Sequence, residues 1–198
     1  MSMTVHYKHV SPWLLALFEK EPELVEPFTV ITDTYDRGVP EAVTIKEDMS
    51  AEHRELLDEI ANDMREKIKE ISPKNAEKIF AEAKSPGLSL YKYFENIQFH
   101  ISGEITDHGT SLISQAVTGG EDVGNDGPYG PATFLPPEEV QDVAAMLAEI
   151  SEEDFLNKYS TDKWDEQTTR FALDYFKAFV AYYIDAAKVS HAMLVWGA

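Results

Sequence analysis

The chain has 198 residues, 43% of them hydrophobic and 11% aromatic, which is enough to form one domain around its own core. It contains no cysteine, which excludes disulfides, thiolate metal sites and a cysteine nucleophile. Its 36 Asp and Glu outnumber its 17 Lys and Arg, and the net charge of −19 disfavours binding to nucleic acids and to anionic membrane surfaces.

The amino-terminal end has no apolar run of signal-peptide length, and no apolar stretch approaches the length of a membrane span. We therefore expect a cytoplasmic protein that does not contact a membrane. The sequence has no internal repeat and no low-complexity tract, so we expect a single domain over residues 1–198.

The first predicted elements are a strand and two helices. Residues 4–10 alternate apolar and polar side chains, which is typical of a β-strand. Ser11 and Pro12 then provide an N-cap and a first-turn proline for a helix. Residues 21–27 predict a second short helix, and residues 29–34 fit either a helix or a strand.

The segment at about residues 32–88 is predicted to be a helical insertion on the core fold. Residues 35–49 lack a regular pattern and contain Gly38 and Pro40. A long amphipathic helix follows Ser50, and a shorter helix comes after it. Acids and lysines are balanced in this segment, as expected of a solvated helical pair.

Shorter helices are predicted in the second half of the chain, at residues 90–102, 111–118, 137–150 and 151–156. The last long helix, residues 168–188, is the most apolar, and aromatic residues cover most of its circumference, so we expect it at the centre of the core. The final apolar strand, residues 192–196, is expected to pair with residues 4–10 in one sheet.

A glycine-rich segment, residues 119–131, lies between two of these helices. It contains five of the ten glycines and two of the ten prolines. This composition predicts a loop rather than a strand or a helix, held at both ends and able to act as a functional surface. We expect at least one of Gly124, Gly127 and Gly130 to have a positive φ angle.

The charge is unevenly distributed along the chain. No Lys or Arg occurs between Lys92 and Lys158, and 13 of these 65 positions are Asp or Glu. Such a surface attracts cations and basic proteins. The candidate binding residues are therefore those of the glycine-rich segment and of the acidic helix start that follows it: Glu121, Asp122, Asp126, Tyr129, Gly130, Glu138 and Glu139.

Several motifs together resemble those of the YfbM-like family of bacterial proteins. They are the strand that runs into Val10-Ser11-Pro12, the glycine-rich segment with Tyr129-Gly130-Pro131, the Pro137-Glu138-Glu139-Val140 helix start and the aromatic C-terminal helix. The resemblance covers most of the chain outside residues 32–88. It implies an α+β fold, with a small mixed β-sheet formed partly by the N- and C-terminal strands and covered by several α-helices, in a bacterial cytoplasm.

The resemblance implies no activity, because none is assigned to the family. In that family, a Trp and a His are usual at positions that Phe94 and Gln98 occupy here. If that His takes part in a reaction in the relatives, this chain lacks the group.

Two patterns resemble metal sites without completing one. Residues 122–127 begin like an EF-hand loop, but Gly124 offers no ligand at the third position and Thr133 stands where a Glu is required. A looser divalent-cation site among the acids of this segment competes with an interpretation in which they only support turns.

His100, Glu104 and His108 are spaced like metal ligands on one face of a helix. Gly103 and Gly109 argue against a helix that long, so a core or surface histidine is favoured. No serine-nucleophile elbow, phosphate-binding loop, dinucleotide fingerprint or zinc-protease motif occurs, so we assign no catalytic residue and no cofactor.

Two functions are consistent with these patterns. The first is a non-enzymatic binding protein that recognises, and in a specific version neutralises, a basic protein partner through the acidic half of the chain. The alternative is a small-ligand or metal-binding protein, or an enzyme, with a pocket under the glycine-rich segment, where Tyr129, Glu121 or Asp126 would supply polar groups.

Overall fold

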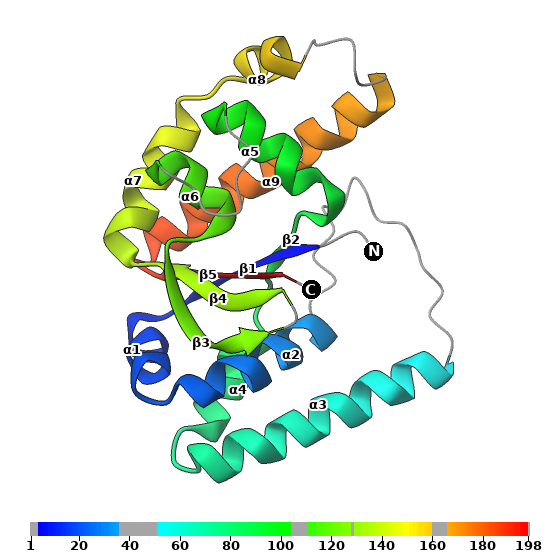
Figure 1. The fold of residues 1–198 in the computed structure, drawn as a ribbon, viewed down its shortest axis with the longest axis vertical. Coiled ribbons are helices and arrows are strands. Elements are labelled where there is room, and N and C mark those ends of the chain that lie inside the picture. The colour runs from blue at the N-terminus through cyan, green and yellow to red at the C-terminus, as the bar shows by residue number, and fades with distance from the viewer. Residues whose placement is uncertain (1–3, 36–50, 104–110, 128, 160–165, 198) are drawn as a thin grey trace.

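A computed structural model describes residues 4–35, 51–103, 111–127, 129–159 and 166–197 of the chain. Its five-stranded sheet, in the order β2-β1-β5-β4-β3, lies between two layers of helices, with α1–α4 on one face and α5–α9 on the other (Figure 1). The expected α+β fold is confirmed. Among the described residues, no helix is long and apolar enough to cross a membrane.

The N- and C-terminal strands lie side by side inside the sheet. Strand β1 (Val5–Val10) pairs along its whole length with β5 (Ala192–Gly197), as the two apolar patterns predict. A two-residue strand, β2 (Leu88–Ser89), pairs with the other side of β1. Each described strand pair is antiparallel, so the expectation of a mixed sheet is wrong in this detail.

One helical layer comes from the first half of the chain. It contains α1 (Pro12–Lys20), the 3₁₀ turn η1 (Pro22–Leu24), α2 (Val25–Tyr35), α3 (Ala51–Ile71) and α4 (Ala76–Ala83). Ser11 caps α1, because its hydroxyl accepts a hydrogen bond from the backbone N–H of Leu14 at 3.3 Å.

These bounds settle part of the N-terminal predictions. The ambiguous residues 29–34 are helical, and only a 3₁₀ turn and the start of α2 occupy residues 21–27. Of the irregular segment predicted at residues 35–49, positions 36–49 lie outside the described part of the chain. The long helix predicted after Ser50 is α3, and the insertion at about residues 32–88 stays a prediction.

The other helical layer comes from the second half of the chain. It contains the 3₁₀ turn η3 (Tyr91–Tyr93), α5 (Phe94–Ser102), α6 (Leu112–Thr118), α7 (Pro137–Ala148), α8 (Glu152–Tyr159) and α9 (Glu166–Lys188). Helix α9 begins two residues earlier than predicted and carries the largest set of buried aromatic side chains in this layer: Tyr175, Phe176, Phe179 and Tyr183.

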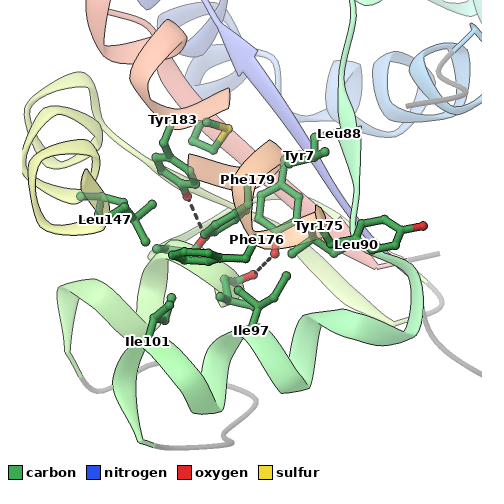
Figure 2. Close-up of a cluster of buried hydrophobic side chains, with 14 of the residues drawn as sticks. Tyr7, Leu88, Leu90, Ile97, Ile101, Leu147, Tyr175, Phe176, Phe179 and Tyr183 are labelled. Atoms are coloured by element: carbon green, nitrogen blue, oxygen red, sulfur yellow. Dashed lines mark hydrogen bonds between the residues drawn. The ribbon is translucent and has the colours of Figure 1, made fainter. Parts of the chain in front are cut away.

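The sheet therefore has an apolar core on each face. On the α9 side, Tyr7 and Phe179 meet edge to face with ring centroids 5.3 Å apart, and Phe155 stacks on Phe176 (Figure 2). On the other side, Val10, Phe134 and Leu194 pack against α1, α2 and α4. Alternate residues of β5 enter the two cores, which is why that strand is apolar throughout.

Two tyrosine hydroxyls buried in the α9-side core reach the end of one helix. Tyr7 donates to the carbonyl of Val117 at 2.7 Å, and Tyr183 donates to the carbonyl of Ala116 at 2.7 Å (Figure 2). Both carbonyls belong to the last turn of α6, where no intrahelical donor is available. These bonds fix α6 above the sheet, directly before the glycine-rich segment.

Replacing Phe179 by Ala should lower the free energy of unfolding by about 3 to 5 kcal/mol, because the ring is fully buried and its removal leaves a cavity. The matched control is Phe99→Ala, the same change at a ring that is 41% exposed. Chemical denaturation measures both. A loss below about 1 kcal/mol in Phe179→Ala would contradict the assignment of α9 to the core.

Candidate functional site

The glycine-rich segment forms a β-hairpin, so the prediction of a loop at residues 119–131 is wrong. Strand β3 spans Glu121–Gly127 and pairs with β4 (Gly130–Leu135) at the edge of the sheet. The register shifts between Val123 and Gly127. A strand with this much glycine is tolerated here because edge strands accept bulges that a central strand would not.

The glycines have specific roles in this hairpin. Gly124 has φ +83°, and a Cβ built on it would lie 2.7 Å from the Cβ of Val25 in α2. Gly130 has φ +98° with open space around it. The expectation of a positive φ among the three glycines is therefore confirmed at two of them. At Gly124, glycine also allows the strand to touch α2.

The structure brings together three of the predicted acidic residues and adds a fourth. Glu138 and Glu139 lie in the first turn of α7, and Glu121 begins β3. Burial raises the pKa of Glu139 above its ordinary value of 4.5, and the neighbouring charges of Glu121, Glu138 and Asp142 raise it further. We call these four residues the acidic face.

The other predicted site residues do not join this cluster. Tyr129 and Gly130 lie at the turn of the hairpin. This turn is about 20 Å from Glu121 along β3, at a rise of ~3.3 Å per residue. Asp122 is exposed and, one residue after Glu121, points to the opposite side of the strand. Asp126 belongs to β3, and its side chain lies outside the described part of the structure.

Sequence reasoning missed a polar cluster between β1 and α2. Nδ1 of His6 lies 2.9 Å from the hydroxyl of Ser89 and 3.2 Å from Oδ1 of Asp33. Trp196 stacks on the His6 ring and donates from Nε1 to Asp33 at 3.2 Å. Burial lowers the pKa of His6 from 6.5 to about 4, so the ring is neutral at neutral pH.

Two arguments favour a structural role for this cluster. Ser89 is 3% exposed and contacts the same nitrogen of His6 as Asp33 does, so it does not form a nucleophile–base–acid relay. The ring of His6 packs against that of Trp196, its partner on the neighbouring strand, with ring centroids 5.5 Å apart. The signal in the sequence was the presence of polar residues, His6 and Lys8, at alternate positions of a strand that also carries the buried Val5, Tyr7 and Val10.

A second polar residue of β1, Lys8, is completely buried. Its ammonium group donates hydrogen bonds to the backbone carbonyls of Ala83, at 3.1 Å, and of Ser85. These carbonyls lie at the C-terminal end of α4, where the helix dipole favours a positive charge. Lys8 therefore joins the sheet to the helical layer beneath it.

The predicted histidine pattern does not form a described metal site. His100 is 2% exposed and lies against the ring of Phe155 with centroids 5.0 Å apart, so it is a core histidine. Glu104 and His108 lie outside the described residues. Among the residues that are described, no group of three or more His, Asp or Glu is arranged to hold a metal ion.

Gln98 is buried and donates to the hydroxyl of Ser114 at 3.1 Å. This bond links α5 to α6. Gln98 thus satisfies a buried polar position, and its amide has no acid–base function at neutral pH.

Comparisons with known proteins give one match. A family model described as "Domain of unknown function (DUF1877)" covers residues 1–196, which agrees with the YfbM-like resemblance of the sequence. No curated protein and no solved structure matches the chain.

Gly124→Ala should destabilise the protein by more than about 2 kcal/mol, because the new Cβ combines left-handed strain with a steric clash against Val25. Gly130→Ala is the control, since it introduces the strain without a neighbour, and it should cost about 1 to 2 kcal/mol. Thermal or urea unfolding compares the two variants. Equal losses would show that contact with α2 does not restrict Gly124.

Glu139→Gln should raise the melting temperature at pH 7. The pKa of Glu139 is raised in the folded state, so its negative charge destabilises the fold above that pKa, and the effect disappears as pH falls below 4.5. The gain should therefore vanish at pH 4 and shrink at high salt. Glu77→Gln, an exposed acid in the first turn of α4, is the control and should give no gain. A gain that is unchanged at pH 4 would contradict the electrostatic explanation.

Proposed function

We propose that this chain, which belongs to the DUF1877 family of unknown function, binds a basic protein partner through the acidic face. The proposal is drawn from the arrangement of its acidic residues. The observation that carries the proposal is the grouping of Glu121, Glu138 and Asp142 near Glu139, whose charges add to the effect of burial in raising the pKa of Glu139. Groups held in an unfavourable electrostatic environment are typical of functional surfaces.

The acidic face has no internal counter-charge. None of its four residues forms an ion pair with a described residue, whereas acids elsewhere do: Glu26 pairs with Lys67 at 2.6 Å and Glu152 with Lys177 at 2.8 Å. A Lys or Arg of a partner would relieve the repulsion within the face. The gain on binding would therefore exceed that of an ordinary exposed ion pair.

The position of the face in the chain supports the same partner class. It lies within the stretch between Lys92 and Lys158 that contains no Lys or Arg, so no basic residue is near it along the chain. The negative field of the acidic face accelerates the approach of a positively charged surface. In the most specific version of the proposal, the protein neutralises its partner by covering that partner's basic surface.

The alternative, a ligand pocket under the hairpin, has less support. Where β3 lies over α2, the side chain of Val25 already reaches within 2.7 Å of the position of a Gly124 Cβ. Tyr129 is 47% exposed at the hairpin turn and is about 20 Å along the strand from Glu121. The groups that were expected to line one pocket are thus spread over the hairpin.

The proposal is tested by replacing the four residues of the acidic face with their amides: Glu121→Gln, Glu138→Gln, Glu139→Gln and Asp142→Asn. Partners captured from a native lysate at low salt are identified, and association with the purified partner is then measured by stopped-flow. The variant should associate at least ~10-fold more slowly at low salt, with a smaller change in the dissociation rate, because charge steers the approach.

The control carries the same change in net charge on α3, at Glu52, Glu55, Asp58 and Glu59, which are all exposed. It should keep most of the association rate. Equal slowing in both variants would show that only net charge matters. The absence of any partner whose capture depends on salt and on the acidic face would overturn the proposal.

A further inference from the structure

Two histidine rings meet where β1 ends and β5 begins. Nδ1 of His9 lies 2.8 Å from Nδ1 of His191, and the ring centroids are 5.0 Å apart. The register explains this contact, because His9 is opposite Met193 and His191 lies two residues before Met193. Both rings therefore project from the same face of the sheet as diagonal neighbours. Both are half-buried, so solvent reaches them.

The backbone of each histidine is held by α9 or its C-terminal turn. The backbone N–H of His9 donates to the hydroxyl of Tyr182 at 3.1 Å, and that hydroxyl donates to the carbonyl of Pro86 at 3.0 Å. The backbone N–H of His191 donates to the carbonyl of Ala186 at 3.0 Å. Both rings are thus positioned by backbone contacts that do not use their nitrogens.

The electrostatic environment keeps His9 neutral. Its pKa is lowered from 6.5 to about 4, first by burial and then by the charges of His191 and Lys8, while Asp185 and Glu82 act in the opposite direction. A neutral imidazole has a lone pair on one ring nitrogen, and this is the form that binds metal ions. As long as the two Nδ1 atoms share one hydrogen bond, one of them must carry a proton.

We propose that His9 and His191 bind a Zn²⁺ ion through their two Nδ1 atoms. Imidazole is a preferred ligand of Zn²⁺, and a tetrahedral ion ~2.0 to 2.1 Å from both nitrogens separates them by about 3.3 Å. The rings therefore need to move apart by only about half an ångström. The shared Nδ1 proton shifts through solvent to Nε2 of the ring that carries it, so both rings stay neutral and both Nδ1 lone pairs face the ion.

This is an open site. Within the described ranges no third His, Asp or Glu completes a ligand group, so water fills the other positions. An ion held by two protein ligands exchanges readily and can accept a donor atom from a bound molecule. The inference does not rest on the proposed partner.

The test is a Zn²⁺ titration of the metal-free protein by isothermal calorimetry. One site with a dissociation constant in the micromolar range is expected. His9→Gln and His191→Ala should each weaken binding at least ~10-fold, which is the loss expected when one of two ligands is removed. His6→Gln is the matched control, because it removes a histidine from the same strand that is outside the pair, and it should bind Zn²⁺ normally. Mg²⁺, which prefers oxygen ligands, should not compete.

A second measurement identifies the ligand atoms and does not depend on the variants folding. Long-range ¹H–¹⁵N spectra of the histidine side chains in the unmodified protein should show Zn²⁺ shifting the Nδ1 resonances of His9 and His191 and leaving that of His6 in place. Absence of saturable binding below about 1 mM, or equal binding by all three variants, would overturn the proposal and leave a simple histidine–histidine hydrogen bond. Shifts at other histidines only would overturn it as well.

Discussion

A strand that helices cover on both faces must find a partner for each polar side chain it carries, and β1 carries three. His6 is packed against Trp196 and contacts Ser89, Lys8 donates to the carbonyls at the end of α4, and His9 meets His191. Desolvating any of these groups without a partner would cost several kcal/mol. The positions of α2 and α4 are consistent with this requirement, since α2 supplies Asp33 to His6 and α4 supplies carbonyls to Lys8, while His191 comes from the turn that follows α9.

In contrast to the partnered polar side chains of β1, the residues of the acidic face have no described partner of opposite charge. Here like charges lie together without a described counter-ion. Burial and these neighbouring charges raise the pKa of Glu139, so its negative charge destabilises the folded state. Some exposed acids elsewhere in the described structure do pair with lysines, as Glu26 and Glu152 do. The proposed recognition of a basic partner therefore rests on the close grouping of these four acids rather than on the total charge.

The parts of the fold that could be predicted are those whose apolar residues recur with a clear helical or strand period. Apolar patterns of helical or strand period predicted the helices at residues 137–148 and 166–188. They also predicted the pairing of the terminal strands. Strand β3 was missed because glycine normally indicates a turn. The reason for a glycine at position 124 is its close contact with Val25, which the sequence does not show. The two residues of β2 are too few for any pattern. Asp142 was not among the predicted site residues, because it lies three residues after Glu139 and comes close to it only through one turn of α7.

The union of the two chain ends in the middle of the sheet has a consequence for biosynthesis. Until β5 leaves the ribosome, β1 and β4 have no partner on the side that β5 will fill, so the nascent chain exposes two open, apolar strand edges. The long-range pairing that closes the sheet is the kind that forms slowly. A chain whose synthesis stops before β5 would therefore have most of these helices and no complete sheet, which is the state that chaperones and proteases recognise.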